Sequence, residues 1–256
     1  SVISYYLNYV SFKRNTAVVV AAGNEATARH HYYGEVAFGQ QSDVVEVNVE
    51  DAVAGFHIEM WAKAPELYSV RIISPTGERT AGVRVQQDGR EVYRFVFENT
   101  QVIIDYHIVG TATGDQLIYI RFDRPTRGIW TIEVNGDYSI EGRYHMWLPI
   151  TGLIAGDISF IRSNPDTTIT MPGNAAAPMT VGGYNAGNDS IYLNSSRGYT
   201  ASGLVKPDFA APGVNVIGPA PGNRFEARSG TSIAAAITAG AAALYLEWAV
   251  ERGYNT

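Results

Sequence analysis

Residues 32–161 show an alternation of apolar and polar residues, and this pattern limits the possible folds of the chain more than any other feature. Apolar and polar residues alternate along nine short segments, and apolar residues at helical spacing are absent. Turn signals such as Pro75-Thr76-Gly77 and Asn135-Gly136-Asp137 separate the segments. Because successive side chains of a strand point to opposite faces, each segment has one apolar face to bury. We therefore predict an antiparallel β-sandwich or jelly roll. The segments are 44–49, 56–62, 70–73, 83–86, 92–97, 102–109, 117–122, 130–134 and 143–147.

The sequence on either side of residues 32–161 has the pattern of helices and buried strands that is typical of an α/β fold. Residues 2–10 place apolar and aromatic side chains at helical spacing. Residues 16–22 form a continuous apolar run, which predicts a strand buried on both faces, as in a parallel sheet. This run ends at Gly23-Asn24, and active sites of open α/β sheets lie at the carboxyl ends of strands. A second short apolar strand is expected from Met179 onward.

A helix rich in alanine is predicted to follow Gly230 and to end at Arg252-Gly253. Its sides are apolar or small almost throughout, so we expect it to be buried nearly all round. Ser232 lies at its N-terminus, where backbone N–H groups have no intrahelical partner. The serine is then either a cap of a core helix or a nucleophile whose own N–H helps to hold an oxyanion.

Four stretches together resemble those of the subtilisin-like proteases, the subtilases. Gly230-Thr231-Ser232, followed by a helix of small residues, resembles their serine motif. The letters Ala-Ala-Gly-Asn ending at Asn24 resemble the motif of their oxyanion asparagine. The stretch 206–213, Lys-Pro-Asp-Phe-Ala-Ala-Pro-Gly, is similar to a further subtilase segment, and residues 169–175 resemble a Pro-Gly loop beside the substrate pocket.

The resemblance implies a partial subtilisin-like parallel sheet with flanking helices, interrupted by the β-domain. Such an inserted domain looks like the jelly roll of the clostridial Csp germination proteases. The expected domains are 1–31 and 164–256 for the α/β part and 32–163 for the insertion. Ser232 is then the nucleophile and Asn24 the oxyanion donor, acting on a peptide or protein substrate. Substrate-binding positions carried over from the family are Ala22, Gly23, Gly173, Gly230 and Thr231.

Two triad residues of the family have no counterpart in this sequence. No aspartate stands before Thr-Gly or Ser-Gly, and no histidine stands before Gly-Thr. Because serine is a weak nucleophile without a base, we expect this chain by itself to be inactive. We interpret it as the C-terminal part of a subtilase whose missing N-terminal half carries both residues. The family also has Pro-His where this chain has Ala236-Ile237.

His30 and His31 are the candidates for a substitute base, since they follow the asparagine within a few residues. The competing interpretation is that they bond the chain where it enters the β-domain. Adjacent histidines point apart on an extended chain, and no carboxylate cluster accompanies them, so no metal site is predicted. No cofactor is identified, and calcium is suggested by the family resemblance alone.

Composition excludes several classes of function. The net charge of −6 argues against a nucleic-acid partner. The absence of cysteine excludes disulfides and thiolate metal sites. No apolar run is expected to reach membrane-spanning length, so no membrane partner is predicted. The family resemblance leaves secretion, the cell surface and the spore open as locations.

The sequence also allows two alternatives to an enzyme fragment. The chain is either part of a catalytically dead pseudoprotease scaffold, or its β-sandwich is a binding module for protein or glycan. Aromatic side chains in the predicted strands favour core packing as their default role; these are Trp61, Tyr93, Trp130, Tyr144 and Trp147. With half of its sheet missing, the α/β part is expected to self-associate or to bind a second chain that completes the sheet.

Overall fold

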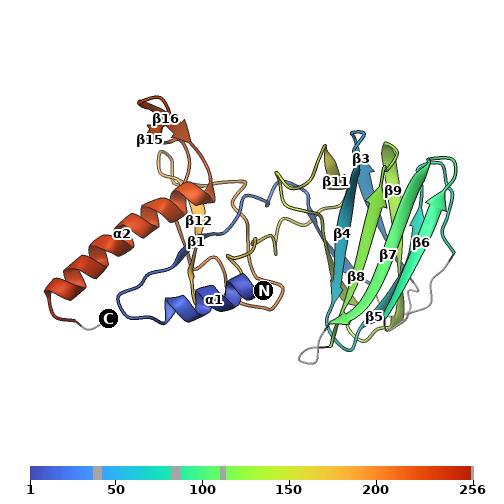
Figure 1. Ribbon diagram of the computed structural model, residues 1–256, viewed down its shortest axis with the longest axis horizontal. Coiled ribbons are helices and arrows are strands. Elements are labelled where there is room, and N and C mark those ends of the chain that lie inside the picture. The colour runs from blue at the N-terminus through green and yellow to red at the C-terminus, as the bar shows by residue number, and fades with distance from the viewer. Residues whose placement is uncertain (37–41, 82–87, 110–113, 255–256) are drawn as a thin grey trace. The chain divides into compact units, whose positions relative to one another are not determined.

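The computed structural model describes residues 1–36, 42–81, 88–109 and 114–254 (Figure 1). Contacts divide the chain into two compact units. The α/β unit comprises Ser1–Ala28 and Pro165–Thr256, and the β unit comprises Arg29–Asn164. The predicted segment 83–86 lies outside the described residues.

The β unit consists of two antiparallel sheets. The first sheet has the strand order β2-β10-β4-β8-β7-β6, and the second has the order β11-β3-β9-β5. Burial alternates along the strands, as in β4, where every second residue is buried. The bounds are β2 His31–Glu35, β3 Ser42–Val49, β4 Gly55–Ala62, β5 Leu67–Ile73, β6 Asp88–Phe95, β7 Thr100–Val109, β8 Asp115–Asp123, β9 Gly128–Tyr138, β10 Arg143–Trp147 and β11 Ile158–Phe160.

Both sheets contribute side chains to one hydrophobic core. Phe56 of β4 stands opposite Phe122 of β8, and their rings stack with centroids 4.6 Å apart. Trp130 of β9, in the other sheet, meets Phe122 edge-on at 5.3 Å. Burial of such apolar surface is the dominant favourable contribution to folding. The period-two pattern of the sequence thus places the apolar face of each sheet toward the other.

The aromatic residues predicted to lie in strands of the β unit differ in their burial. Trp130 and Tyr144 are fully buried in the core, and Tyr93 packs against it while half-buried. Trp61 and Trp147 differ, because their strand neighbours Met60, Ala62 and Met146 are the residues that point into the core. By strand alternation these two tryptophans lie on the outer face of the six-stranded sheet. Core packing is therefore the wrong default for Trp61 and Trp147.

A histidine pair occupies the same outer face near the ends of β2 and β10. His31 Nε2 lies 2.9 Å from His145 Nδ1, and His31 Nδ1 lies 3.2 Å from the carbonyl oxygen of Asn164. Both imidazoles stack on Trp147 with centroids 5.0 Å away. Burial, followed by the nearby charges of His31 and Lys63, lowers the pKa of His145 to about 4. The His145 ring is consequently neutral at pH 7.

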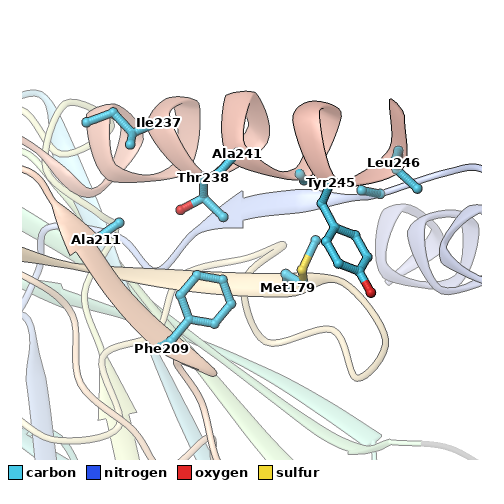
Figure 2. Close-up of a pocket in the computed structure, with 10 residues that line it drawn as sticks. Met179, Phe209, Ala211, Ile237, Thr238, Ala241, Tyr245 and Leu246 are labelled. Atoms are coloured by element: carbon cyan, nitrogen blue, oxygen red, sulfur yellow. The ribbon is translucent and has the colours of Figure 1, made fainter. Parts of the chain in front are cut away.

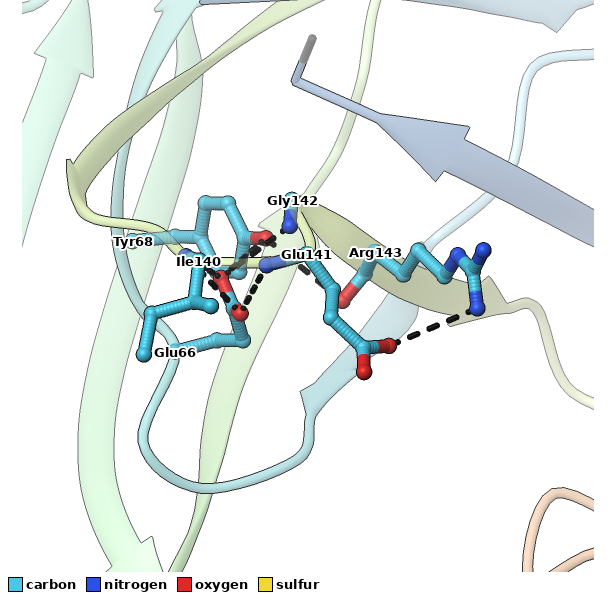
Figure 3. Close-up of polar contacts among 6 residues, drawn as sticks. All are labelled: Glu66, Tyr68, Ile140, Glu141, Gly142 and Arg143. Carbon is cyan, nitrogen blue, oxygen red and sulfur yellow. Dashed lines mark hydrogen bonds and ion pairs between the residues drawn. The ribbon is translucent and has the colours of Figure 1, made fainter. Parts of the chain in front are cut away.

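A buried carboxylate holds the turn between β9 and β10 (Figure 3). The Glu66 carboxylate accepts backbone N–H bonds from Ile140 at 3.0 Å, Glu141 at 2.7 Å and Gly142 at 3.3 Å, and the Tyr68 hydroxyl donates to it at 3.2 Å. Burial of Glu66 opposes ionisation, but these backbone hydrogen bonds outweigh it and hold the pKa of Glu66 below its ordinary value. The carboxylate form is thus the one that the turn requires.

Replacing Glu66 by glutamine is expected to lower the free energy of unfolding by about 2 kcal/mol, because hydrogen bonds to a charged acceptor are lost. The lowered pKa means that wild-type stability from this site is present above the ordinary glutamate pKa and is lost as pH falls below it. Urea unfolding followed by circular dichroism measures both effects.

Glu141→Gln is the matched control for Glu66→Gln. The Glu141 carboxylate is exposed and bonds Arg143 at 3.4 Å on the surface (Figure 3), so its loss is expected to cost under about 0.5 kcal/mol. Equal effects of the two substitutions would contradict the assigned role of Glu66.

The α/β unit is built on a short parallel arrangement of β1, β12 and β14. Strand β12 pairs in parallel with β1 on one side and with β14 on the other, and helix α2 contacts all three. Figure 1 labels β1, β12 and α2 in this unit. Strands β15 and β16 form an antiparallel hairpin that leads into α2. The bounds are α1 Val2–Ser11, β1 Val19–Ala21, β12 Met179–Asn185, β13 Ser190–Ile191, β14 Phe209–Pro212, β15 Val216–Ala220, β16 Arg224–Arg228 and α2 Thr231–Glu251.

Helix α2 ends as the sequence predicts, but its burial differs from the expectation. Gly253 has φ +73°, and the Tyr254 N–H donates to the Ala249 carbonyl at 3.0 Å, which closes the last turn. Most of the helix is exposed, including Leu244 at 69% and Trp248 at 47%. The prediction of burial nearly all round is wrong for this chain, because the strands that it contacts cover only one side of it.

The expectation that no apolar run reaches membrane-spanning length is also wrong. By length and composition α2 meets that criterion, because it has 21 residues and contains an 18-residue window with a mean hydropathy of 1.6. The physical reason is its alanine content, which keeps the helix free of charge over most of its length. Buried side chains on α2, such as Thr231, Ala234 and Thr238, lie in its first turns, where it packs on the sheet.

Candidate active site

The first part of the candidate site is the loop that follows β1. Ala22 is fully buried, and its N–H donates to Val181 of β12 at 3.0 Å, which extends the parallel pairing by one residue. Gly23 follows with φ +107°, and a Cβ there would stand 2.6 Å from Thr170 Oγ1 and 2.7 Å from Ser196 Oγ. Only glycine fits this backbone and this space. The chain therefore turns sharply and presents Asn24 at the surface.

The second part is the start of α2. Gly230 occupies the N-cap position with φ 154° and offers no side-chain cap, so the first N–H groups of the helix need other acceptors. The Gly230 N–H donates to the Gly213 carbonyl at 2.8 Å, which joins the helix start to the end of β14. Ser232 is exposed on the first turn, and within the described part of the chain its hydroxyl makes no hydrogen bond.

The two parts meet at Gly230 although they are far apart in sequence. The Thr231 N–H donates to Asn24 Oδ1 at 3.0 Å. A Cβ placed on Gly230 would lie 3.3 Å from Ser232 Oγ and 3.7 Å from Asn24 Nδ2. The serine hydroxyl and the asparagine amide thus border the same small volume, in front of a helix N-terminus where negative charge is favoured. Gly230 leaves this volume open.

The remaining predicted substrate-binding residues have structural contacts of their own. A Cβ on Gly173 would stand 2.8 Å from the Ala21 carbonyl oxygen, so this glycine packs against the backbone of β1. The Gly173 carbonyl accepts a hydrogen bond from Thr180 Oγ1 at 2.7 Å. Thr231 is fully buried, and its hydroxyl lies within hydrogen-bond distance of Gly23 and Asn24. The structure therefore brings together Ala22, Gly23, Asn24, Gly230, Thr231 and Ser232.

His31 is occupied within the β unit. Its two ring nitrogens lie at hydrogen-bond distance from His145 and from the Asn164 carbonyl, so neither is left to accept a proton from a serine. The backbone of His30 accepts a hydrogen bond from Leu148. These contacts favour the interpretation that the pair bonds the chain at its entry into the β unit. Among the described residues, no group of three or more histidine, cysteine, aspartate or glutamate side chains has metal-binding geometry.

Ser196 anchors the asparagine loop, a role that was not predicted from the sequence. Its hydroxyl accepts the Glu25 N–H at 3.0 Å, and its own N–H donates to the Gly23 carbonyl at 2.9 Å. Ser196 itself is almost fully buried. A serine in an irregular segment carries no periodicity and no motif, so nothing in the sequence marks this role.

An apolar groove lies beneath α2, on the side of the helix that faces the strands (Figure 2). It has a volume of about 530 Å³. Ile237 and Tyr245 line it from the helix, and Met179 and Phe209 line it from the strands. Ile237 stands where the subtilase pattern has histidine. An open groove of this composition is a surface that apolar side chains of another segment fit.

Comparisons with known proteins agree with the motifs. Residues 153–253 match the model of the Subtilase family. The chain is 38% identical over 106 residues to the serine protease AprX of Bacillus subtilis, a match covering 33% of this chain and 24% of AprX. It is 32% identical over 93 residues to the C5a peptidase of Streptococcus pyogenes, covering 36% of this chain and 8% of that protein.

The fold agrees with a solved protease over nearly its full length. The CspB protease of Clostridium perfringens superposes with a TM-score of 0.88 at 27% sequence identity. That match covers 98% of this chain and 53% of the CspB chain. The chain therefore spans about half of the CspB chain, and a quarter or less of these two curated relatives.

Proposed function

We propose, from the premise that residues 153–253 are a subtilase segment, that this chain is the C-terminal part of a serine endopeptidase. The observation that carries the proposal is the meeting of Ser232 Oγ and Asn24 Nδ2 at Gly230. Two groups brought together from opposite ends of the chain, at a helix N-terminus, match the needs of acyl transfer to serine. Peptide or protein is the substrate class that follows.

In the proposed reaction, Ser232 Oγ attacks a peptide carbonyl carbon and a C–O bond forms. The negative charge that develops on the carbonyl oxygen is held by Asn24 Nδ2 and the Ser232 N–H. A histidine takes the hydroxyl proton and passes it to the leaving amine as the peptide C–N bond breaks, and an aspartate orients that histidine. Water then cleaves the ester on Ser232 and releases the acid. Neither the histidine nor the aspartate has a match in this sequence, and the proposal assigns both to a segment outside it. This chain alone is accordingly expected to be inactive.

The same proposal extends to the fold. Strands β1, β12 and β14 are then three neighbouring strands of a larger subtilisin-like sheet, and the β unit is a jelly-roll-like domain inserted between Asn24 and Ser232. The domain limits predicted from the sequence, 1–31, 32–163 and 164–256, differ from the compact units by one to three residues. Superposition on CspB over 98% of the chain supports this arrangement.

The proposed fold also gives the apolar groove an occupant. Strand β1 is half-exposed and lies at the end of its strand order among the described strands. The groove and this edge fit the missing N-terminal half of the sheet. In its absence, we expect a second copy of the chain to cover the same surface, which is apolar along α2.

The test is labelling with a fluorophosphonate probe, which reacts only with an activated serine. The complete protease is expected to be labelled, and the 256-residue chain alone is not. An intact, folded complete protein that resists labelling would favour the pseudoprotease alternative. Substitution of Ser232 then shows whether labelling depends on the proposed nucleophile.

A second candidate function is binding by the β unit, favoured by the outer face of the six-stranded sheet. Trp61 lies there beside Glu59, to which its Nε1 donates at 3.0 Å, and Tyr119 stacks on His57 at 4.9 Å. Rings interleaved with hydrogen-bonding groups are typical of surfaces that hold sugars or polypeptides.

Trp61→Ala tests this second candidate. If the face binds, the variant is expected to lose about tenfold or more in affinity on a glycan or peptide array, as expected for an aromatic anchor. Val44→Ala, which removes an exposed apolar side chain from the other sheet, is the control. Unchanged binding by Trp61→Ala would exclude this face.

A further inference from the structure

We infer that Asn24 has two roles at once, and that Thr231 is a positioning residue for it. Asn24 Oδ1 caps the N-terminus of α2, while Nδ2 of the same carboxamide remains a donor beside Gly230, the residue that Ser232 Oγ also borders. The catalytic half of this inference rests on the proposed function. The capping half depends only on the contacts between the loop after β1 and the start of α2.

The capping role follows from the first turn of α2. Gly230 has no side chain, so the helix lacks a cap from its own N-cap residue. The Thr231 N–H is one of the groups without an intrahelical acceptor, and it donates to Asn24 Oδ1 at 3.0 Å. Asn24 therefore supplies from a distant loop what serine or aspartate supplies locally in other helices.

This bond also fixes which end of the carboxamide faces the site. A backbone N–H can only donate, so the group beside it must be the amide oxygen. The NH₂ end of Asn24 is then left free of the Thr231 N–H. A Cβ on Gly230 would lie 3.7 Å from Nδ2 and 3.8 Å from Oδ1, so both ends of the carboxamide border the space at Gly230. An asparagine flipped the other way would set an NH₂ group against the Thr231 N–H. The helix start thus selects the orientation that an oxyanion needs.

The Thr231 hydroxyl strengthens the same contact. It accepts the Gly23 N–H at 3.1 Å, and its hydrogen is within reach of the Gly23 carbonyl at 3.1 Å and of Asn24 Oδ1 at 3.2 Å. Thr231 is fully buried, so its side chain ties the loop to the helix rather than facing a substrate. The donor is consequently in place before a substrate arrives, which is the condition for effective oxyanion stabilisation.

Amide hydrogen exchange at Thr231 in the 256-residue chain tests the capping role without any catalysis. Because this N–H has no intrahelical partner, its protection reports the bond to Asn24. Asn24→Ala is expected to speed its exchange about tenfold. Asn24→Asp keeps an acceptor at the positive end of the helix dipole and is expected to exchange no faster than wild type.

Thr231→Val and Thr231→Ser form a matched pair that keeps the test decisive if Asn24→Ala does not fold. The valine retains the N–H and the shape but loses the hydroxyl, and is expected to exchange about threefold faster. The serine retains the hydroxyl and is expected to match wild type. Wild-type exchange at position 231 in both Asn24→Ala and Thr231→Val would overturn the inference.

Labelling and turnover of the complete protease test the catalytic half. Asn24→Asp is expected to react about 10²–10³-fold more slowly, because a carboxylate cannot donate to the oxyanion although the cap persists. Thr231→Val is expected to lower kcat about tenfold with KM nearly unchanged, and Thr231→Ser to restore it. Wild-type rates in Asn24→Asp would refute the catalytic half. A complete protein that is never labelled would refute the proposed function, and the exchange rates would still decide the cap.

Discussion

Replacing Ser232 by alanine is expected to reduce labelling and peptide hydrolysis by the complete protease to background. Loss of the nucleophile costs roughly a million-fold in kcat in a subtilisin, because the remaining groups have no covalent intermediate to stabilise. The measurement is the rate of fluorophosphonate labelling, followed by in-gel fluorescence, together with hydrolysis of an unstructured protein substrate.

Ser229→Ala is the matched control for Ser232→Ala. Ser229 precedes α2, and its hydroxyl accepts the Asn215 N–H at 2.9 Å, so its loss is expected to leave labelling within about twofold of wild type. Labelling that survives in Ser232→Ala would assign the reaction to another residue and end the proposal. Circular dichroism of both variants checks that the fold is retained.

Replacing Trp130 by alanine is expected to cost about 3–5 kcal/mol of unfolding free energy, the largest stability effect that we predict. Trp130 is fully buried in β9, where it meets Phe95 at 5.2 Å and Phe122 at 5.3 Å, both edge-on. Since those rings come from β6 and β8, the indole fills the space between the two sheets. Its Nε1 donates to the Thr126 carbonyl at 2.9 Å, and this acceptor would be left without its partner.

Trp61→Ala separates the effect of the position from the effect of removing a tryptophan. Trp61 lies on the outer face and is half-buried, so we expect its removal to cost about 1 kcal/mol or less. Urea unfolding followed by far-ultraviolet circular dichroism compares the two variants without relying on tryptophan fluorescence. Equal losses of stability would show that Trp61 had been assigned incorrectly to the outer face of the six-stranded sheet.

Sequence motifs and the spacing of apolar residues predict much of the local structure. The helix over residues 231–251 and the glycine at its C-terminus follow from composition and from the needs of the last turn. Most strands of the β unit follow from alternation, because one face of each had to be buried, but β2 and β11 were not predicted. Asn24 and Ser232 were predicted by resemblance to a family, and the match of residues 153–253 supports that resemblance for the segment that contains Ser232.

Burial was predicted less well, because it depends on what each surface meets. Alternation places Trp61, Trp147 and His145 on one face of a sheet, but it does not say which face is covered. An apolar helix such as α2 is expected to be buried, but most of it is exposed. Its exposure depends on which other segments pack against it, and the sequence of the helix does not give this. The predicted buried strand from residue 16 onward is likewise shorter and half-exposed as β1.

The sequence by itself determined much of the secondary structure, the family resemblance and the residue types proposed for acyl transfer, since these depend on short-range pattern. Tertiary structure decided how distant residues meet. It placed Asn24 against the first N–H of α2, set Ser196 beneath the asparagine loop and engaged His31 within the β unit. Hydrogen bonds between loops carry no periodicity, because each depends on two positions that only the folded chain brings within 3 Å.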